Sequence, residues 1–169
     1  MESQRTLALD VGDRRIGLAI TDPLGLTAQP LFTVHRKTLR ADLKAIARFI
    51  RQHHVTTVVV GNPLHADGTP GAQAAKAQAF AKALAAEHRS LEHHLLDERL
   101  TTRAAHELLD AAGGARRSAG AGSRTSGKEM RVSRTEIIDQ VAAVLLLESF
   151  LARRSGPALL PDPEAEHGA

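Results

Sequence analysis

The 169-residue sequence contains no cysteine, tryptophan or tyrosine, and only four phenylalanines. The lack of cysteine excludes disulfide bonds, thiolate zinc sites and thiol nucleophiles, and nothing points to an oxidising compartment. We therefore expect a cytoplasmic protein. Because aromatic residues are so scarce, extensive stacking of nucleobases on aromatic side chains is not expected, and any nucleic acid would be held mainly through its phosphates.

Long hydrophobic runs are also missing. No stretch is long enough to span a membrane, and the charged N-terminus lacks the apolar core of a signal peptide. Hydrophobic residues make up 43% of the chain and charged residues 24%, as in an ordinary globular protein, and the length favours one domain. A net charge of +3 gives only weak support for a polyanionic partner.

The stretch from Thr6 to Thr21 predicts two apolar strands joined by a tight turn. Asp10 stands where the first strand ends, and Gly12 suits a tight turn that Arg15 keeps polar. Gly12 and Arg15 are also candidates for substrate binding, Gly12 in the floor of the site and Arg15 as a contact to backbone phosphates. A carboxylate at the end of a buried strand, beside a glycine that lets phosphate approach the backbone, often serves metal and phosphate chemistry. The alternative is a hairpin whose aspartate only begins the turn.

Strand and helix patterns then alternate along the chain. Strands are expected near residues 28–35, 56–60 and 91–96, and helices near 39–53, 72–88 and 135–152, with another helix beginning at Thr101 or Thr102. We predict an α/β fold with a five-stranded mixed sheet in the order 3-2-1-4-5, strand 2 antiparallel and helices on both faces. Pro30 predicts that the third strand lies at an edge. The carboxyl ends of strands one and four would then form a crevice where ligands tend to bind.

Two segments lack any hydrophobic period. Residues 112–131 are rich in Gly, Ser, Ala and Arg and predict a mobile basic loop, and residues 155–169 predict a disordered tail. The folded domain is therefore expected to span residues 1–154. Arg124 and Lys128 in the basic loop are candidates for nucleic-acid binding, the alternative being a charged segment that is merely solvated.

Three carboxylates are the candidate catalytic residues. Asp10 follows the first strand, Glu98 follows the fifth, and Asp139 lies in the last helix among small and apolar residues. A buried carboxylate needs a cation or dense hydrogen bonding. Oxygen ligands without thiols or clustered imidazoles favour Mg²⁺ or Mn²⁺ over zinc. Two such ions about 4 Å apart can activate water and stabilise the leaving oxygen of a phosphodiester, with Asp10 bridging them.

These residues also have structural interpretations. Asp139 could be a charge favoured near a helix N-terminus, and Glu98 could pair with a neighbouring arginine at the surface. Most of the nine histidines are interpreted as surface residues. His65 is a candidate substrate-binding residue because its loop, rich in turn formers, should open onto the crevice, and Asn62 would shape the floor of that crevice.

Taken together, five motifs resemble the YqgF family, which comprises pre-16S ribosomal RNA nucleases and Holliday-junction-resolvase-like proteins. The motifs are Leu9-Asp10-Val11-Gly12 with Arg15-Ile16-Gly17, Asp22-Pro23-Leu24-Gly25, Gly61-Asn62-Pro63 with Asp67-Gly68, Asp97-Glu98-Arg99-Leu100-Thr101-Thr102, and Ile138-Asp139-Gln140-Val141-Ala142-Ala143. They span residues 7 to about 151. The resemblance implies an RNase H-like fold, metal-dependent cleavage of nucleic acid, and an acidic triad of Asp10, Glu98 and Asp139. Thr101 of the fourth motif is a further candidate for substrate binding.

The sequence therefore predicts an endonuclease that hydrolyses phosphodiester bonds with two Mg²⁺ or Mn²⁺ ions. The resemblance implies a role in 5′-end processing of pre-16S rRNA during ribosome biogenesis. The alternatives are a Holliday-junction resolvase acting on branched DNA, a non-catalytic RNA-binding module, and a sugar- or acetate-kinase-like ATPase, which the single domain and the lack of a Walker-type loop disfavour. RNA is the favoured partner, branched DNA the other candidate, no membrane contact is expected, and both a monomer and a homodimer are compatible.

Overall fold

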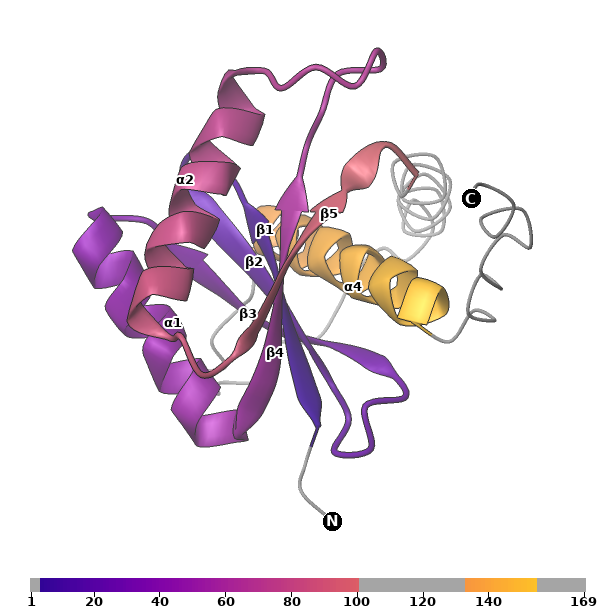
Figure 1. Ribbon diagram of the computed structural model, residues 1–169. Helices are drawn as coiled ribbons and strands as arrows, with labels where there is room; N and C mark the ends of the chain where they lie inside the picture. The colour runs from indigo at the N-terminus through magenta and orange to yellow at the C-terminus, as the bar shows by residue number, and fades with distance from the viewer. Residues whose placement is uncertain (1–3, 101–132, 155–169) are drawn as a thin grey trace, which may run out of the picture.

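A single mixed sheet of five strands forms the centre of the fold (Figure 1). The computed structural model describes residues 4–100 and 133–154. In chain order the strands are β1 (Arg5–Val11), β2 (Arg15–Thr21), β3 (Ala28–His35), β4 (Val55–Asn62) and β5 (Glu92–Asp97). Their order in the sheet is β3-β2-β1-β4-β5; β2 runs antiparallel to β1 and β3, whereas β1, β4 and β5 are parallel. The predicted strand order and antiparallel strand 2 are confirmed.

Helices cover both faces of the sheet, as predicted (Figure 1). Helices α1 (Leu39–His53) and α2 (Ala72–Glu87) lie on one face, and α4 (Arg134–Arg154) lies on the other, while the short 3₁₀ helix η1 (Glu98–Leu100) follows β5. Thr38 caps α1, because its Oγ1 accepts a hydrogen bond of 3.2 Å from the backbone N–H of Ala41.

The two hydrophobic cores follow from the alternation of side chains along each strand. Leu7 and Leu9 of β1 point into the larger core beneath α1 and α2. Ala8, between them, points to the other face and packs against α4. Asp10 is two residues beyond Ala8, so it belongs to the α4 face. The small side chains of this face let α4 lie close to β1, β2 and β3.

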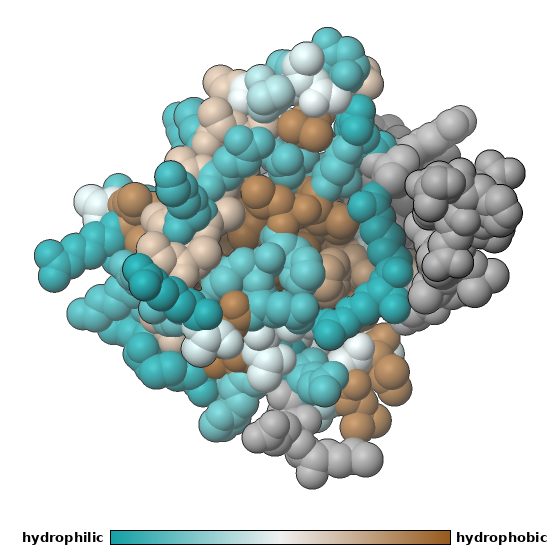
Figure 2. Space-filling view, in the orientation of Figure 1, coloured by the Kyte–Doolittle hydropathy of each residue, from teal (hydrophilic) through white to brown (hydrophobic). Residues whose placement is uncertain are grey.

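The two edge strands of the sheet, β3 and β5, differ in their pairing and in their exposed side chains. In β3, the pairing shifts at Pro30, since Leu18 of β2 is opposite Phe32 but Ala19 is opposite Pro30. The order of the strands places β3 at one end of the sheet, which confirms the edge position predicted from Pro30. At the other edge, Figure 2 shows hydrophobic side chains around β5 bordered by hydrophilic ones, and Leu95 of β5 is 49% exposed.

Element boundaries depart from the predicted ones by one or two residues. Strand β4 continues through Gly61 to Asn62, and α4 begins at Arg134 and extends to Arg154. The helix predicted from Thr101, the basic loop and the C-terminal tail lie outside the described residues. In the described part of the chain, no helix has the length and apolar character needed to cross a membrane.

Candidate functional site

The three predicted carboxylates come from three different elements. Asp10 is near the end of β1, Glu98 begins η1 directly after β5, and Asp139 lies in the second turn of α4. Because β1 and β5 are both parallel to β4, their carboxyl ends lie at the same edge of the sheet. The first turn of α4 holds Glu136, so the helix-terminal charge considered for Asp139 is supplied by a different residue.

The carboxylates of Asp10, Glu98 and Asp139 are electrostatically coupled. Burial, and secondly repulsion from Asp139, raises the pKa of Asp10 to about 6. Burial raises the pKa of Glu98 to about 7, with further contributions from Asp10 and Asp97. Asp10 is therefore the central member, coupled to both of the others. Such raised carboxyl pKa values at an edge of a sheet are typical of functional sites.

Two glycines allow this close approach. Gly17 of β2 is directly opposite Asp10 of β1, and a methyl group at Gly17 would collide with the backbone carbonyl of Asp139. A methyl group at Gly61 of β4 would collide with the carboxylate of Glu98. Gly17 therefore leaves room for Asp139 of α4, and Gly61 leaves room for Glu98 of η1. Sequence reasoning counted Gly17 and Gly61 as motif residues but did not identify this role, which depends on contacts between distant segments.

Arg15, a predicted phosphate-binding residue, contacts one of these carboxylates directly. Its Nε donates a 2.5 Å hydrogen bond to Oδ2 of Asp139, and both side chains are less than a third exposed. The neighbouring turn is held by the backbone N–H of Gly12, which donates to the carbonyl of Arg15 at 2.9 Å. The carbonyl of Gly12 in turn accepts a hydrogen bond from Arg36. The turn that follows Asp10 is thus fixed from both sides.

The loop after β4 supplies the next two candidates. Asn62 ends β4, and its Oδ1 accepts a 3.0 Å hydrogen bond from Gln78 of α2. His65 is exposed, and its ring lies against Gly71 at the start of α2. The structure therefore places Asn62 at the carboxyl end of β4, bonded to α2, and the ring of His65 toward α2. Thr101, Arg124 and Lys128 lie outside the described residues.

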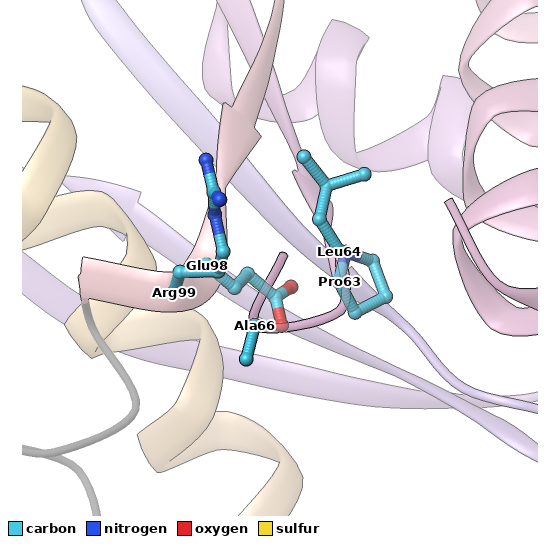
Figure 3. Close-up of a pocket in the computed structure, with 5 residues that line it drawn as sticks. All are labelled: Pro63, Leu64, Ala66, Glu98 and Arg99. Carbon is cyan, nitrogen blue, oxygen red and sulfur yellow. The ribbon is translucent and has the colours of Figure 1, made fainter. Parts of the chain in front are cut away.

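The loop also borders a cavity of about 420 Å³ that the sequence did not predict (Figure 3). We call it the Arg99 pocket; its lining residues are Pro63, Leu64, Ala66, Glu98 and Arg99. Figure 3 shows Glu98 and Arg99 on one side, Pro63 and Leu64 opposite, and the Glu98 carboxylate pointing into the space between them. Asp97 and Arg99 form an ion pair at 2.5 Å beside the cavity. In the sequence, this pair is indicated only by the spacing of Asp97 and Arg99, which lie on either side of Glu98.

A divalent cation fits the chemistry of this site. The candidate donors are carboxylate oxygens alone, the type that Mg²⁺ and Mn²⁺ prefer, and a cation would relieve their mutual repulsion. Within residues 4–100 and 133–154, no three histidine, aspartate or glutamate side chains are arranged as a metal site. Asp139 is instead held by Arg15. For Asp10, Glu98 and Asp139 to bind metal together, Asp139 would have to leave Arg15 and the side chains would have to move; metal binding by this triad is therefore a proposal.

Known proteins resemble this chain over nearly its whole length. The family model described as "RuvX: Holliday junction resolvase" matches residues 4–153. A Moorella thermoacetica protein named "Putative pre-16S rRNA nuclease" is 42% identical over 149 residues, which are 88% of this chain and 95% of the relative. A protein of the same name from Koribacter versatilis is 42% identical over 150 residues, which are 89% of this chain and 88% of the relative.

A solved structure shares the fold. Thermus thermophilus RuvC, in complex with Holliday junction substrate, matches with a TM-score of 0.54 and 16% identity, covering 89% of this chain and 96% of that one. At this identity, the likeness bears on the fold alone. Together with the strand order, it confirms the predicted RNase H-like class.

Proposed function

The chain belongs to the RuvX family of Holliday junction resolvases, which confirms the predicted resemblance to the YqgF family, and from this premise we propose that it is a metal-dependent endonuclease acting on pre-16S rRNA. The reaction is hydrolysis of a phosphodiester bond during 5′-end processing. The names of the Moorella and Koribacter relatives support the RNA substrate. The observation that carries the proposal is the coupled set of carboxylates at one edge of the sheet.

Asp10, Glu98 and Asp139 would hold two Mg²⁺ or Mn²⁺ ions in this function. Such ions, when bound, activate a water molecule and stabilise the leaving oxygen of the phosphodiester. Of the three, Asp10 is the residue that is electrostatically coupled to both of the other carboxylates. Metal ligation requires all three groups to be deprotonated, so the raised pKa values make metal uptake compete with protons near neutral pH.

Other side chains would position the nucleic acid. Arg15 lies beside Asp139, where its guanidinium could transfer from the carboxylate to a backbone phosphate of the substrate. Gly12 and Asn62 would shape the floor of the site, and Thr101, Arg124 and Lys128 remain candidates by sequence. Phosphate contacts of this kind predict binding that weakens as salt concentration rises.

Resolution of branched DNA is the second candidate function. The description of the matching family favours it, and the solved RuvC complex contains a Holliday junction. A symmetric four-way junction would be served by a homodimer, whereas a precursor RNA end can be cleaved by a monomer. Sedimentation of the protein with each substrate therefore complements the activity test.

The deciding experiment is cleavage of three matched substrates by the wild-type protein and by Asp139→Asn. The substrates are single-stranded RNA, a structured precursor fragment of 16S rRNA and a four-way DNA junction, each with Mg²⁺, Mn²⁺ or chelator. We expect metal-dependent cleavage of RNA that is lost in Asp139→Asn. Asp13→Asn is the matched control, since Asp13 lies in the turn after β1 but is exposed and paired with Lys76.

Each alternative outcome has a distinct meaning. Cleavage of the junction alone would replace the RNA substrate with branched DNA. Undiminished metal-dependent cleavage by Asp139→Asn would overturn the role of the triad. Salt-sensitive RNA binding without any cleavage would replace the enzyme with an RNA-binding module.

A further inference from the structure

The Arg99 pocket has the size and chemistry of a site for one planar, partly apolar group. Its volume of about 420 Å³ lies in the range of pockets that bind small ligands. Pro63, Leu64 and Ala66 supply apolar surface on the side of the β4–α2 loop. Glu98 and Arg99 supply charged and hydrogen-bonding groups across the space from Pro63 and Leu64 (Figure 3). A nucleobase combines these two requirements, because it has apolar faces and polar edges.

Arg99 is oriented by Asp97, two residues before it in the chain. Its Nε donates to both carboxylate oxygens of Asp97, at 2.8 and 3.1 Å, and its Nη2 donates to Oδ2 at 2.5 Å. The backbone N–H of Arg99 donates to the same carboxylate at 3.0 Å. This two-pronged pairing orients the plane of the guanidinium before any ligand arrives.

Gly68 leaves room for this guanidinium on the loop side. A methyl group at Gly68 would lie 3.0 Å from Nη1 of Arg99, and the φ of +86° at Gly68 is one that other residues rarely adopt. The backbone of the loop can therefore approach Arg99 closely without a side chain intervening.

None of the described residues that line this pocket is aromatic, and the ring of His65, in the same loop, lies against Gly71 instead. The chain has no tryptophan or tyrosine, and its four phenylalanines lie elsewhere. Phe32 contacts Phe49, Phe80 is buried in the larger core, and Phe150 contacts His94 beside β5. An arginine guanidinium is another planar side chain on which proteins stack unpaired bases. Among the described residues, Arg99 is the arginine that lines the pocket.

We propose that the Arg99 pocket binds one unpaired nucleobase of the substrate, packed between the guanidinium of Arg99 and the apolar side chains of Pro63 and Leu64. The inference rests on the proposed nuclease function. Glu98 lines the pocket and is also a member of the candidate catalytic cluster, so the bound base would belong to a nucleotide next to the cleaved phosphate. The substrate is therefore single-stranded RNA at this position, since a base within a continuous duplex cannot enter the pocket.

Fluorescence of 2-aminopurine tests this inference without depending on cleavage. A set of single-stranded RNAs, each with 2-aminopurine at a different position, is titrated with the full chain in Ca²⁺, and RNA integrity is checked on gels. We expect the fluorescence to change strongly at one position and little at the others. The same label within an RNA duplex should show no such change.

Variants of Arg99 connect the signal to the pocket. Arg99→Ala should weaken binding of the responsive RNA about tenfold and abolish the fluorescence change. Arg99→Lys keeps the charge opposite Asp97 but loses the planar group, so it should bind RNA but give a reduced change. Arg48→Ala, an exposed position on α1, is the control and should match wild type. Thermal melting verifies that each variant is folded.

The outcomes separate this inference from the proposed function. A position-specific signal that Arg99→Ala leaves intact, equal signals at all positions, or an equal signal in duplex RNA would each overturn the pocket. Cleavage of RNA without a position-specific signal would overturn the pocket but leave the nuclease in place. A position-specific, Arg99-dependent signal without cleavage would retain the pocket and overturn the nuclease.

Discussion

Arg15 and Asp139, which are 124 residues apart in the sequence, form an ion pair that joins the start of β2 to α4. Arg15 Nε donates to Asp139 Oδ2 at 2.5 Å. In the proposed function, Asp139 binds metal and Arg15 binds phosphate, so this contact has to be exchanged when substrate and metal are bound. The guanidinium thus supplies, in the free protein, positive charge that the carboxylate cluster requires.

Arg15→Gln is the direct test of this exchange. Removing the guanidinium frees Asp139, so Mn²⁺ should bind the protein without nucleic acid several-fold more tightly than it binds wild type. Affinity for RNA should fall. The slope of log affinity against log salt concentration should become less steep by about one, as expected for the loss of one phosphate contact. Calorimetry gives the metal affinity, and fluorescence anisotropy gives the RNA affinity. Arg14→Gln, at the exposed neighbouring position, is the control and should change neither the metal affinity nor the packing of α4. Mn²⁺ binding by Arg15→Gln that is equal to or weaker than that of wild type would contradict the exchange.

Gly17→Ala is expected to push α4 away from the sheet. The added methyl group meets the backbone carbonyl of Asp139, which cannot rotate away as a side chain can. We expect a loss of about 2 kcal/mol in the free energy of unfolding, measured by urea denaturation, and a loss of cleavage activity. In Gly71→Ala the new methyl group meets only the ring of His65, 2.5 Å from Nε2, which can turn aside. The control should thus be close to wild type in stability, and similar losses in both variants would contradict the close-approach role.

Gly61→Ala should separate activity from stability. Its methyl group would collide with the end of the Glu98 side chain, so the carboxylate is displaced while the backbone of β4 can remain in place. We expect cleavage to fall as far as in Glu98→Gln, with a loss in the free energy of unfolding below about 1 kcal/mol. Cleavage rates and urea denaturation of both variants measure the two effects. Wild-type cleavage by Gly61→Ala would show that the position of Glu98 in this structure is not the active one.

The pKa of Asp10 predicts how stability of the metal-free protein depends on pH. Burial raises this pKa from 3.8 to about 6 in the folded state, so the folded protein binds the proton more tightly than the unfolded chain does. The resulting stabilisation is present at acid pH and is lost as pH rises through about 6. Between about pH 4 and pH 8, wild type should lose about 2–3 kcal/mol relative to Asp10→Asn. Urea denaturation in chelator measures the difference; parallel pH profiles for the two proteins would exclude a strongly raised pKa at Asp10.

The fold was predictable because local patterns agree with the global arrangement. Apolar runs of strand length, turn residues and the helical period after Leu39 specified the elements, and the rule for right-handed crossovers then specified the sheet order. Pro30 identified the edge strand, because proline lacks the N–H that an internal strand needs. The family and fold predictions are confirmed, whereas the assignment of the triad and the substrate-binding residues stays a prediction.

The details of the site were not predictable from the sequence, because they depend on distances between segments. No local pattern connects Arg15 to Asp139, and either residue could have faced solvent. The requirement for glycine at position 17 arises only when α4 is packed on β2. The pairing of Asp97 with Arg99 is local, but its relation to the apolar loop around Pro63 appears only in the folded sheet.

The distribution of the three carboxylates along the chain has a consequence for synthesis of the protein. Asp10 belongs to the first strand, whereas Asp139 belongs to the final described helix, which packs against the first three strands. A ribosome therefore completes most of the sheet before the residue that would complete the catalytic set has left the exit tunnel. Under the proposed function, the enzyme would gain the ability to cut RNA only when translation of its domain is nearly finished.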